Sequence, residues 1–340
     1  GHQERLPQDE VHLSIPQGLD FDKKKICLKL KKAIYGLRQA PLAWYRRLSN
    51  WLIDWGFKVS KADSCVFHHN GDDPIWLFVH VDDIRVFGKN LTKFKKAIEA
   101  EFSTKILGQD DLMLGIKVTH EESFFTLSQF HYIDFCLDLN GMTNCKPVAT
   151  ALIPNTHLEA ASDEDRKNFS VLNGNYHSAI GSLSYLITAT RPDLSFAISA
   201  LSQFLESPGI QHWHAFLHVL KYLKGTSSIG LTYCRNNQEP PTAYSDADWG
   251  NRRVSRQSVT GYLVTIHNNL VICKTRKQPT ISLSSAESEY KSLTDLSFKL
   301  MWFRQLCKEI PIYTENRPII VHEDNQGWIG TENGDCKTNS

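Results

Sequence analysis

Apolar and polar positions are patterned most clearly between Ile75 and Lys89, where two β-rich apolar runs flank two adjacent acids. Valine, isoleucine, phenylalanine and tryptophan fill both runs, and Gly88 closes the second. The pattern predicts a strand, a tight turn and a second strand, with Asp82 and Asp83 at the tip. Adjacent carboxylates repel each other unless a cation lies between them and a partner. The hairpin is therefore a candidate site for a divalent metal that handles phosphate, although solvated turn residues would give the same pattern.

Helical spacing of apolar residues is found on both sides of this hairpin. Leucine, tyrosine and tryptophan recur every three or four residues between Pro41 and Gly56, and Leu91–Phe102 is a second amphipathic stretch. A polar segment from Thr150 to Asn173 predicts a linker, and helical periodicity returns between Tyr176 and Lys224. Between these regions the pattern predicts strands near 112–118 and 124–127 and a helix at 129–139.

The pattern changes again after Asn236–Thr242, a segment that contains two adjacent prolines. Three strands, a helix, a strand and a helix then follow, an order that predicts an α/β domain with a mixed sheet. The predicted elements are a strand at 243–249, paired strands at 259–266 and 270–275, a helix at 285–310, a strand at 319–322 and a short helix after Asn325.

Three acids of this last domain lie where its elements begin or end. Asp246 is in the first strand, Glu287 is at the start of the long helix, and Asp324 follows the last strand. If the helix packs across the sheet, the three carboxylates can converge and hold two Mg²⁺ ions that act on a phosphodiester.

Each of these acids also has a purely structural interpretation. Ser284 and Glu287 have the spacing of a capping box, and Asp324 is placed to cap the helix after it. Asp246 and Asp248 face the same side of their strand, so spacing alone does not choose between them.

Composition adds little about partners. Lysine plus arginine total 38 and aspartate plus glutamate 37, so a nucleic-acid partner is indicated only locally, by the basic run from Lys23 to Lys32. A solvated lysine-rich face is the more common explanation of such a run. The eight cysteines show no CxxC pair, which favours reduced thiols, and no apolar run is long enough to span a membrane. We therefore expect an intracellular protein, cytoplasmic or nuclear, with no membrane partner.

Nine motifs along nearly the whole chain carry a family resemblance. They are LKKAIYGLRQAPLAWY at 30–45, HVDDI at 80–84, LGI at 114–116, GMTNCKP at 141–147, IGSLSYLITATRPDLSFA at 180–197, YLKGT at 222–226, YSDADWG at 244–250, SLSSAESEY at 282–290 and EDNQ at 323–326. Their identity and order resemble the reverse transcriptase and RNase H region of copia-type LTR retrotransposon Pol polyproteins.

The resemblance implies a fold class and three domains. Residues 1–120 would form part of an α+β palm, an antiparallel sheet with helices, and residues 121–239 a helical thumb or connection with its linker near 150–173. Residues 240–340 would form an RNase H-like α/β domain with a mixed sheet, without its last helix. In the parent element such a protein is particle-associated.

The same resemblance implies roles for individual residues. Asp82 and Asp83 match the paired metal-binding acids of the polymerase, and Asp246, Glu287 and Asp324 match the RNase H acids, with Mg²⁺ or Mn²⁺ as cofactor. The implied partners are an RNA template, a DNA primer, their RNA–DNA hybrid and dNTPs. The residues expected to contact these substrates are Gly36, Arg38, Gln39 and His80.

Two departures from the family pattern concern the polymerase site. The family's third polymerase acid belongs to a strand before the segment that Asp9–Gly18 resembles, so we expect this sequence to lack that acid. In addition, His80 stands where the family usually has tyrosine. We therefore expect a metal-dependent polymerase and RNase H fragment that makes no DNA by itself. The alternative is a catalytically inactive or domesticated relic that only binds nucleic acid.

Overall fold

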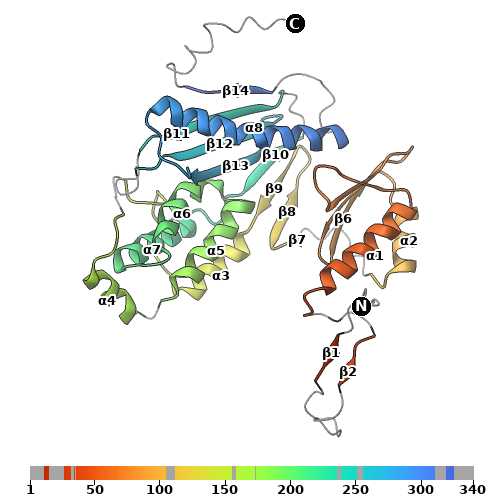
Figure 1. Cartoon of the computed structure of the whole chain (residues 1–340), viewed down its shortest axis with the longest axis horizontal. Coiled ribbons are helices and arrows are strands. Elements are labelled where there is room, and N and C mark those ends of the chain that lie inside the picture. The colour runs from red at the N-terminus through yellow and green to blue at the C-terminus, as the bar shows by residue number, and fades with distance from the viewer. Residues whose placement is uncertain are drawn as a thin grey trace, which may run out of the picture. The chain divides into compact units, whose positions relative to one another are not determined.

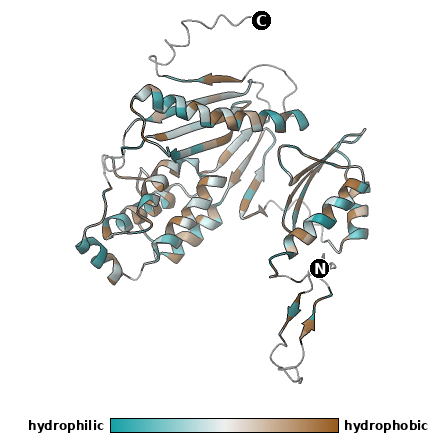
Figure 2. Ribbon diagram, in the orientation of Figure 1, coloured by the Kyte–Doolittle hydropathy of each residue, from teal (hydrophilic) through white to brown (hydrophobic). Residues whose placement is uncertain are grey.

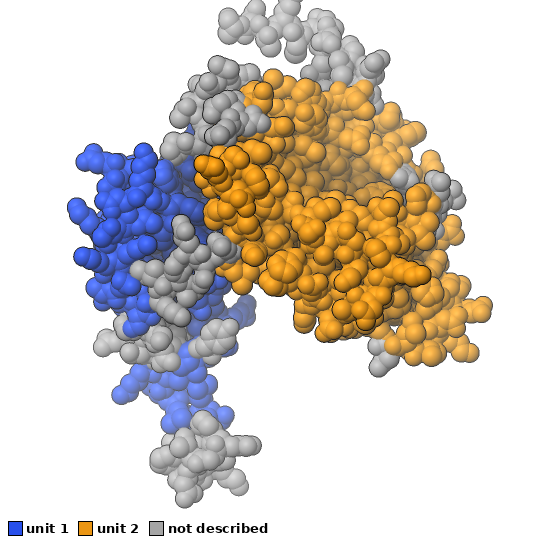
Figure 3. Space-filling model, turned by 180° about the vertical axis from the view of Figure 1, so that it is seen from behind, with its two compact units in different colours: residues 1–109, 300–316 blue, residues 110–299, 317–340 orange. Residues whose placement is uncertain are grey.

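The computed structural model describes residues 11–14, 27–31, 34, 36–104, 112–154, 158–172, 174–235, 239–250, 256–310 and 319–324. The chain divides into two compact units, residues 1–109 with 300–316 and residues 110–299 with 317–340 (Figure 3). Within the described ranges, no helix combines the length and the apolar character needed to cross a membrane. The helix predicted after Asn325 lies outside the described residues, as do residues 23–26 and 32 of the basic run from Lys23 to Lys32.

The first unit contains a four-stranded antiparallel sheet with helices α1 and α2 packed on one face (Figure 1). The strand order is β3-β4-β5-β6, and a separate ribbon pairs β1 with β2. The elements are β1 His12–Leu13, β2 Leu28–Lys29, α1 Ala40–Asp54, β3 Lys58–Val59, β4 Val66–His69, β5 Ile75–His80, β6 Asp83–Gly88 and α2 Thr92–Glu101.

Two periodicities build the core of this unit. Alternate residues of β5, Ile75, Leu77 and Val79, are buried, as the period of two along a strand requires. Leu48 and Leu52, one helical turn apart on α1, are fully buried against them. The predicted strand–turn–strand and the predicted helix before it are confirmed.

The second unit contains a helical cluster and two further sheets. One sheet has the order β10-β9-β8-β7 and is antiparallel throughout. The elements are β7 Leu112–Met113, β8 Ile116–His120, β9 Phe124–Ser128, α3 Phe130–Leu139, α4 Asp163–Val171, α5 Tyr176–Ala189, η1 Pro192–Leu194, α6 Ser195–Leu201, η2 Ser202–Phe204, α7 Ile210–Gly225 and β10 Leu231–Cys234.

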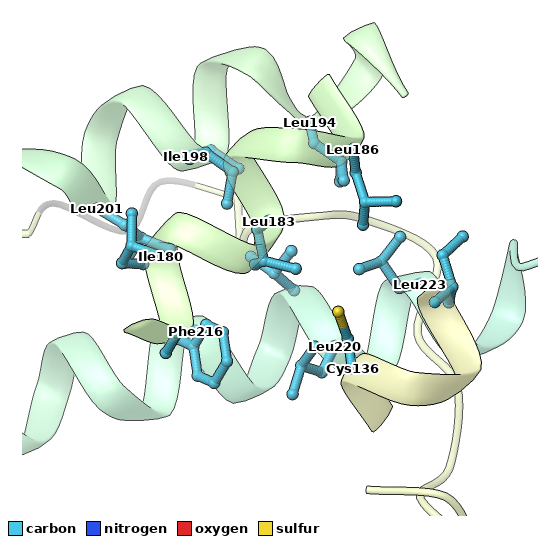
Figure 4. Close-up of a cluster of buried hydrophobic side chains, with 14 of the residues drawn as sticks. Cys136, Ile180, Leu183, Leu186, Leu194, Ile198, Leu201, Phe216, Leu220 and Leu223 are labelled. Atoms are coloured by element: carbon cyan, nitrogen blue, oxygen red, sulfur yellow. The ribbon is translucent and has the colours of Figure 1, made fainter. Parts of the chain in front are cut away.

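The helices of this cluster surround one apolar core. Figure 4 shows the side chains of α5, α6 and α7 pointing toward one another, with Cys136 of α3 among them. Leu183, Leu186, Phe216 and Leu220 have no exposed surface. Burial on this scale is the main stabilising contribution in a helical cluster.

A buried arginine joins two ends of the cluster. Arg191, after α5, is fully buried and donates from Nε and Nη2 to the two carboxylate oxygens of Asp193, at 2.9 and 2.8 Å. It also donates to the carbonyl of Thr226 after α7, at 3.0 Å, and the Tyr222 hydroxyl donates to Asp193 at 2.9 Å. We call these four residues the Arg191 clasp, and it satisfies a charge that would otherwise be costly to bury.

Two elements of this unit differ from the sequence prediction. The segment 150–173, predicted to be a linker, contains α4, whose N-terminus has a capping box between Ser162 and Asp165. Strand β10, at 231–234, was not predicted, and it pairs with β9. Helix α4 is mostly hydrophilic (Figure 2), which explains why an apolar pattern does not find it.

The last sheet is mixed, as predicted. Its order is β13-β12-β11-β14, with β11 antiparallel to β12 and parallel to β14. Helix α8 lies across one face of this sheet (Figure 1). The elements are β11 Thr242–Asp248, β12 Val259–Ile266, β13 Asn269–Lys277, α8 Ser285–Glu309 and β14 Ile320–His322.

Candidate metal and nucleic-acid sites

Three carboxylates from the mixed sheet and α8 converge at one point. Asp246, Glu289 and Asp324 each offer one oxygen, and these oxygens all lie within 4.8 Å of one another. Asp246 is in β11, and Asp324 is two residues beyond β14, which runs parallel to β11. Because parallel strands end at the same edge, the two aspartates meet there, and α8 contributes Glu289 from near its start. We call this group the acidic triad.

Small hydroxyl side chains bring α8 close to β11. Ser288 and Ser292 of α8 are fully buried. The Ser292 hydroxyl donates to the backbone carbonyl of Asp246 at 2.9 Å and accepts from the Ser245 hydroxyl at 3.0 Å. Gln278 donates to the carbonyl of Ser288 at 2.8 Å. Hydrogen bonds therefore fix the position of the β11 backbone relative to the helix that carries Glu289.

The acidic triad concentrates negative charge in a partly buried place. Glu289 is only 5% exposed, and burial, followed by repulsion from Glu323, Asp246 and Asp324, raises its pKa to about 8. Burial and the charge of Asp324 also raise the pKa of Asp246. The Oε2 atom of Glu289 is buried and has no hydrogen-bond partner among the described residues. Such an arrangement is costly without a cation.

The residues of the triad fit a divalent metal. Three carboxylate oxygens are the hard ligands that Mg²⁺ and Mn²⁺ prefer, and such sites leave further coordination positions for water and substrate phosphate. The unpartnered Oε2 of Glu289 supplies an acceptor that a cation would satisfy. Asp246, rather than Asp248, is the β11 aspartate in this group.

Glu287, which the sequence analysis assigned to this group, is not part of it in the structure. Its backbone N–H donates to the Ser284 hydroxyl at 3.1 Å, and its carboxylate accepts from the N–H of Leu283 at 2.7 Å. Lys291 pairs with the same carboxylate at 2.7 Å. Hydrogen bonds from Lys291 and Leu283 lower the pKa of Glu287. Glu287 therefore caps α8, the structural alternative that its spacing had left open.

The choice between Glu287 and Glu289 depends on which face of α8 meets the sheet. At about 100° per residue, Glu289 lies about 60° around the helix from Ser292, whereas Glu287 lies about 140° from it. Ser288, Ser292 and Leu296 are fully buried and define the face of α8 that meets the sheet. Glu289 is therefore closer to that face than Glu287, in agreement with its place in the acidic triad.

The second predicted site is the tip of the β5–β6 hairpin. His80 pairs with Asp83, so Val81 and Asp82 are the two turn residues and Asp83 begins β6. The turn was predicted to centre on the two aspartates, and it is shifted by one residue. Asp82 and Asp83 are both exposed and adjacent, and Val81 has a φ of 51°. The hairpin brings two carboxylates to an open tip without a third acid among the described residues.

The segment predicted to contact template and nucleotide directly precedes α1. Gly36 has a φ of 95°, a left-handed conformation that favours glycine, and Arg38 is exposed. Gln39 is the N-cap residue of α1, and its side chain makes no capping hydrogen bond. Arg38 is therefore open to solvent, and Gln39 is half-buried.

Comparison with known proteins defines the class. Residues 5–154 match the family of reverse transcriptases, described as RNA-dependent DNA polymerases. The chain is 34% identical to the retrovirus-related Pol polyprotein from transposon RE1 of Arabidopsis thaliana, over 94% of the chain and 22% of that protein. It is 31% identical to the corresponding polyprotein from transposon TNT 1-94 of Nicotiana tabacum, over 95% of the chain and 25% of that protein. No solved structure matches the chain significantly.

A shorter relative is matched over most of its own length. The putative transposon Ty5-1 protein of Saccharomyces cerevisiae is 30% identical, over 77% of the chain and 86% of that protein. The chain belongs to the copia-type retrovirus-related Pol polyproteins of transposons and carries their reverse transcriptase domain. It spans about a quarter or less of the length of the two plant polyproteins.

Proposed function

We propose that the acidic triad binds divalent metal and that residues 240–340 cleave the RNA strand of an RNA–DNA hybrid, as an RNase H. The observation that carries this proposal is the convergence of Asp246, Glu289 and Asp324 within 4.8 Å, with Oε2 of buried Glu289 unpartnered. The strand order β13-β12-β11-β14, with α8 across it, supports an RNase H-like arrangement.

The chain's own residues have defined tasks in this reaction. Divalent cations in such a site activate a water molecule and stabilise the leaving oxygen of the phosphodiester. Asp246 and Asp324 hold the cation from the sheet edge, and Glu289 holds it from the helix. Because burial and its acidic neighbours raise the pKa of Glu289 to about 8, a cation binds in competition with a proton on that carboxyl.

We further propose that residues 1–120 form the palm of the reverse transcriptase and residues 121–239 its thumb or connection. Asp82 and Asp83 then hold the metal of the polymerase site at the hairpin tip. Gly36, Arg38 and Gln39 contact the template or the incoming nucleotide, and His80 lies beside the primer. These assignments are supported by the reverse transcriptase match over residues 5–154 and by the exposure of the two aspartates.

The test is Mg²⁺-dependent cleavage of labelled RNA in an RNA–DNA hybrid by the full chain. Asp246→Asn and Glu289→Gln are the test variants, and Glu287→Gln is the matched control, since it changes the same group two residues away on the same helix. We expect both test variants to lose at least 100-fold in rate. The control should keep most of its activity.

Two outcomes would reject the proposal. If Glu287→Gln loses cleavage and Glu289→Gln keeps it, Glu287 and not Glu289 takes part in the reaction. Absence of cleavage by the folded protein, with hybrid binding intact, would favour a protein that only holds nucleic acid. Binding is measured in the same samples by fluorescence anisotropy at several salt concentrations, because phosphate contacts weaken as salt rises.

A further inference from the structure

Trp44 connects the body of the first unit to the turn that carries Asp82. Its indole Nε1–H donates to the backbone carbonyl of Val81, with 2.8 Å between nitrogen and oxygen. Trp44 lies in the first turns of α1, and 37 residues separate it from Val81 along the chain. The hydrogen bond therefore joins a helix to the tip of a hairpin.

The turn needs such support. Val81 has a φ of 51°, a conformation that β-branched residues rarely adopt because their side chains crowd the backbone. Strained backbone of this kind persists only where surrounding contacts hold it. Val81 is 50% exposed, so burial of its side chain contributes little. A hydrogen bond to its carbonyl acts directly on the orientation of the peptide before Asp82.

Trp44 is itself held by the core. Its ring meets the ring of Phe102 edge to face, with centroids 5.3 Å apart, and Phe102 is 2% exposed. Leu48, one turn further along α1, is fully buried. The indole N–H is therefore a fixed donor, and its position depends on packing that the hairpin tip does not share.

The same helix follows the segment proposed to contact nucleotide. Gly36, Arg38 and Gln39 immediately precede Ala40, the first residue of α1, and Trp44 is one turn beyond. We propose that Trp44 is a positioning residue that fixes the tip of the β5–β6 hairpin, with Asp82 and Asp83, relative to α1 and to the segment before it. The inference rests on the proposed polymerase role of Asp82 and Asp83, and no direct contact between Trp44 and substrate is part of it.

Trp51 provides a matched control on the same helix. Its ring also meets Phe102 edge to face, with centroids again 5.3 Å apart, and it packs on Phe94. It makes no hydrogen bond to the hairpin tip among the described residues. Trp44→Phe and Trp51→Phe therefore remove the same atoms beside the same ring, and only the first removes the bond to Val81.

The first readout does not depend on metal. Hydrogen exchange of the peptide covering residues 75–88 is followed by mass spectrometry in the full chain. We expect exchange at the tip to become about three- to ten-fold faster in Trp44→Phe, the range produced by losing one hydrogen bond, and to stay unchanged in Trp51→Phe. Equal exchange in the two variants overturns the inference.

The second readout separates positioning from simple stabilisation. Mn²⁺ binding is measured by electron paramagnetic resonance in a protein that carries Asp246→Asn, which removes a ligand of the acidic triad. The binding assigned to the hairpin tip is the part that is lost when Asp82→Asn is added. Trp44→Phe should weaken this binding about three- to ten-fold, whereas Trp51→Phe should weaken it less than two-fold. The two variants are compared under conditions in which their melting temperatures are equal. Unchanged Mn²⁺ binding in Trp44→Phe overturns the positioning role.

A further result would concern the proposed function instead. If the Asp246→Asn protein shows no Mn²⁺ binding that depends on Asp82, the proposed polymerase metal site is rejected. The positioning of metal ligands by Trp44 is then rejected with it, whereas the exchange measurement still shows whether Trp44 holds the turn. The two failures are thus distinguished by which measurement changes.

Discussion

Replacing Glu289 by glutamine should stabilise the protein when no divalent metal is present. The carboxyl is 5% exposed, and burial with three acidic neighbours raises its pKa to about 8. In the unfolded chain the same group titrates near 4.3. Between these two values the folded state retains a proton that the unfolded state releases, so stability falls as pH rises from about 4 to about 8. A neutral glutamine removes this loss.

The size of the gain follows from the difference in pKa. Each pKa unit corresponds to about 1.4 kcal/mol, and pH 7 lies about 2.7 units above the unfolded value, which sets an upper limit of about 3.7 kcal/mol at pH 7. Asp246 and Asp324 are exposed, so water screens part of the repulsion, and we expect a gain of about 1–2 kcal/mol. Saturating metal should reverse the order, because metal at about 100 times its dissociation constant stabilises the wild type by about 2.7 kcal/mol.

The assay is urea unfolding at pH 5 and pH 8, with EDTA or with Mg²⁺. Glu287→Gln is measured in parallel, and we expect it to lose stability slightly, since Glu287 caps α8 and pairs with Lys291. The reasoning would be refuted if Glu289→Gln were less stable than wild type at pH 8 in EDTA. It would be refuted equally by a gain of the same size at pH 5 and pH 8.

Two further predictions concern the helical cluster. Asp193→Asn should destabilise the protein by about 2–4 kcal/mol in urea unfolding, because it leaves the buried Arg191 without its charged partner. Burial raises the pKa of Asp193, but the hydrogen bonds and charge of Arg191 outweigh it and lower the pKa overall. The advantage of the wild type over the variant should therefore disappear as pH falls below about 4. Stability should also fall as pH drops from about 7 to about 5, because burial lowers the pKa of His212, whose Nδ1 accepts the Gly209 N–H at 2.9 Å. His212→Gln should remove this dependence of the melting temperature on pH. An unchanged dependence would contradict the assignment to His212.

Local sequence predicts the parts of this fold that local forces determine. The β5–β6 hairpin and α1 follow from periods of two and about 3.6, since each buries one apolar face. Helix α4 was missed because DEDRKNFSV has no apolar face, although its Ser162–Asp165 capping box was readable. Strand β10 is held by β9, more than 100 residues earlier, and no local pattern reports that pairing.

The acidic triad shows the same division at the level of single residues. Asp324 follows from its position after the last strand, whereas Asp246 and Asp248 face the same side of β11 and the structure is needed to choose Asp246. The choice between Glu287 and Glu289 depends on which face of α8 meets the sheet, a tertiary property. The sequence placed Glu287 at the helix start, and the buried stripe of Ser288, Ser292 and Leu296, which the structure shows, selects Glu289 instead.

The Arg191 clasp has a consequence for how sequences of this kind diverge. Arg191 and Asp193 lie more than 25 residues before Tyr222 and Thr226, yet all four close one hydrogen-bonded circuit. Loss of Asp193 leaves the buried charge of Arg191 without its carboxylate, and loss of the Thr226 hydroxyl removes another acceptor of Arg191 Nη2. Inherited substitutions in the two segments should therefore be accepted together or not at all. In an alignment of many related chains, substitutions in the RPDL and YLKGT segments should therefore covary.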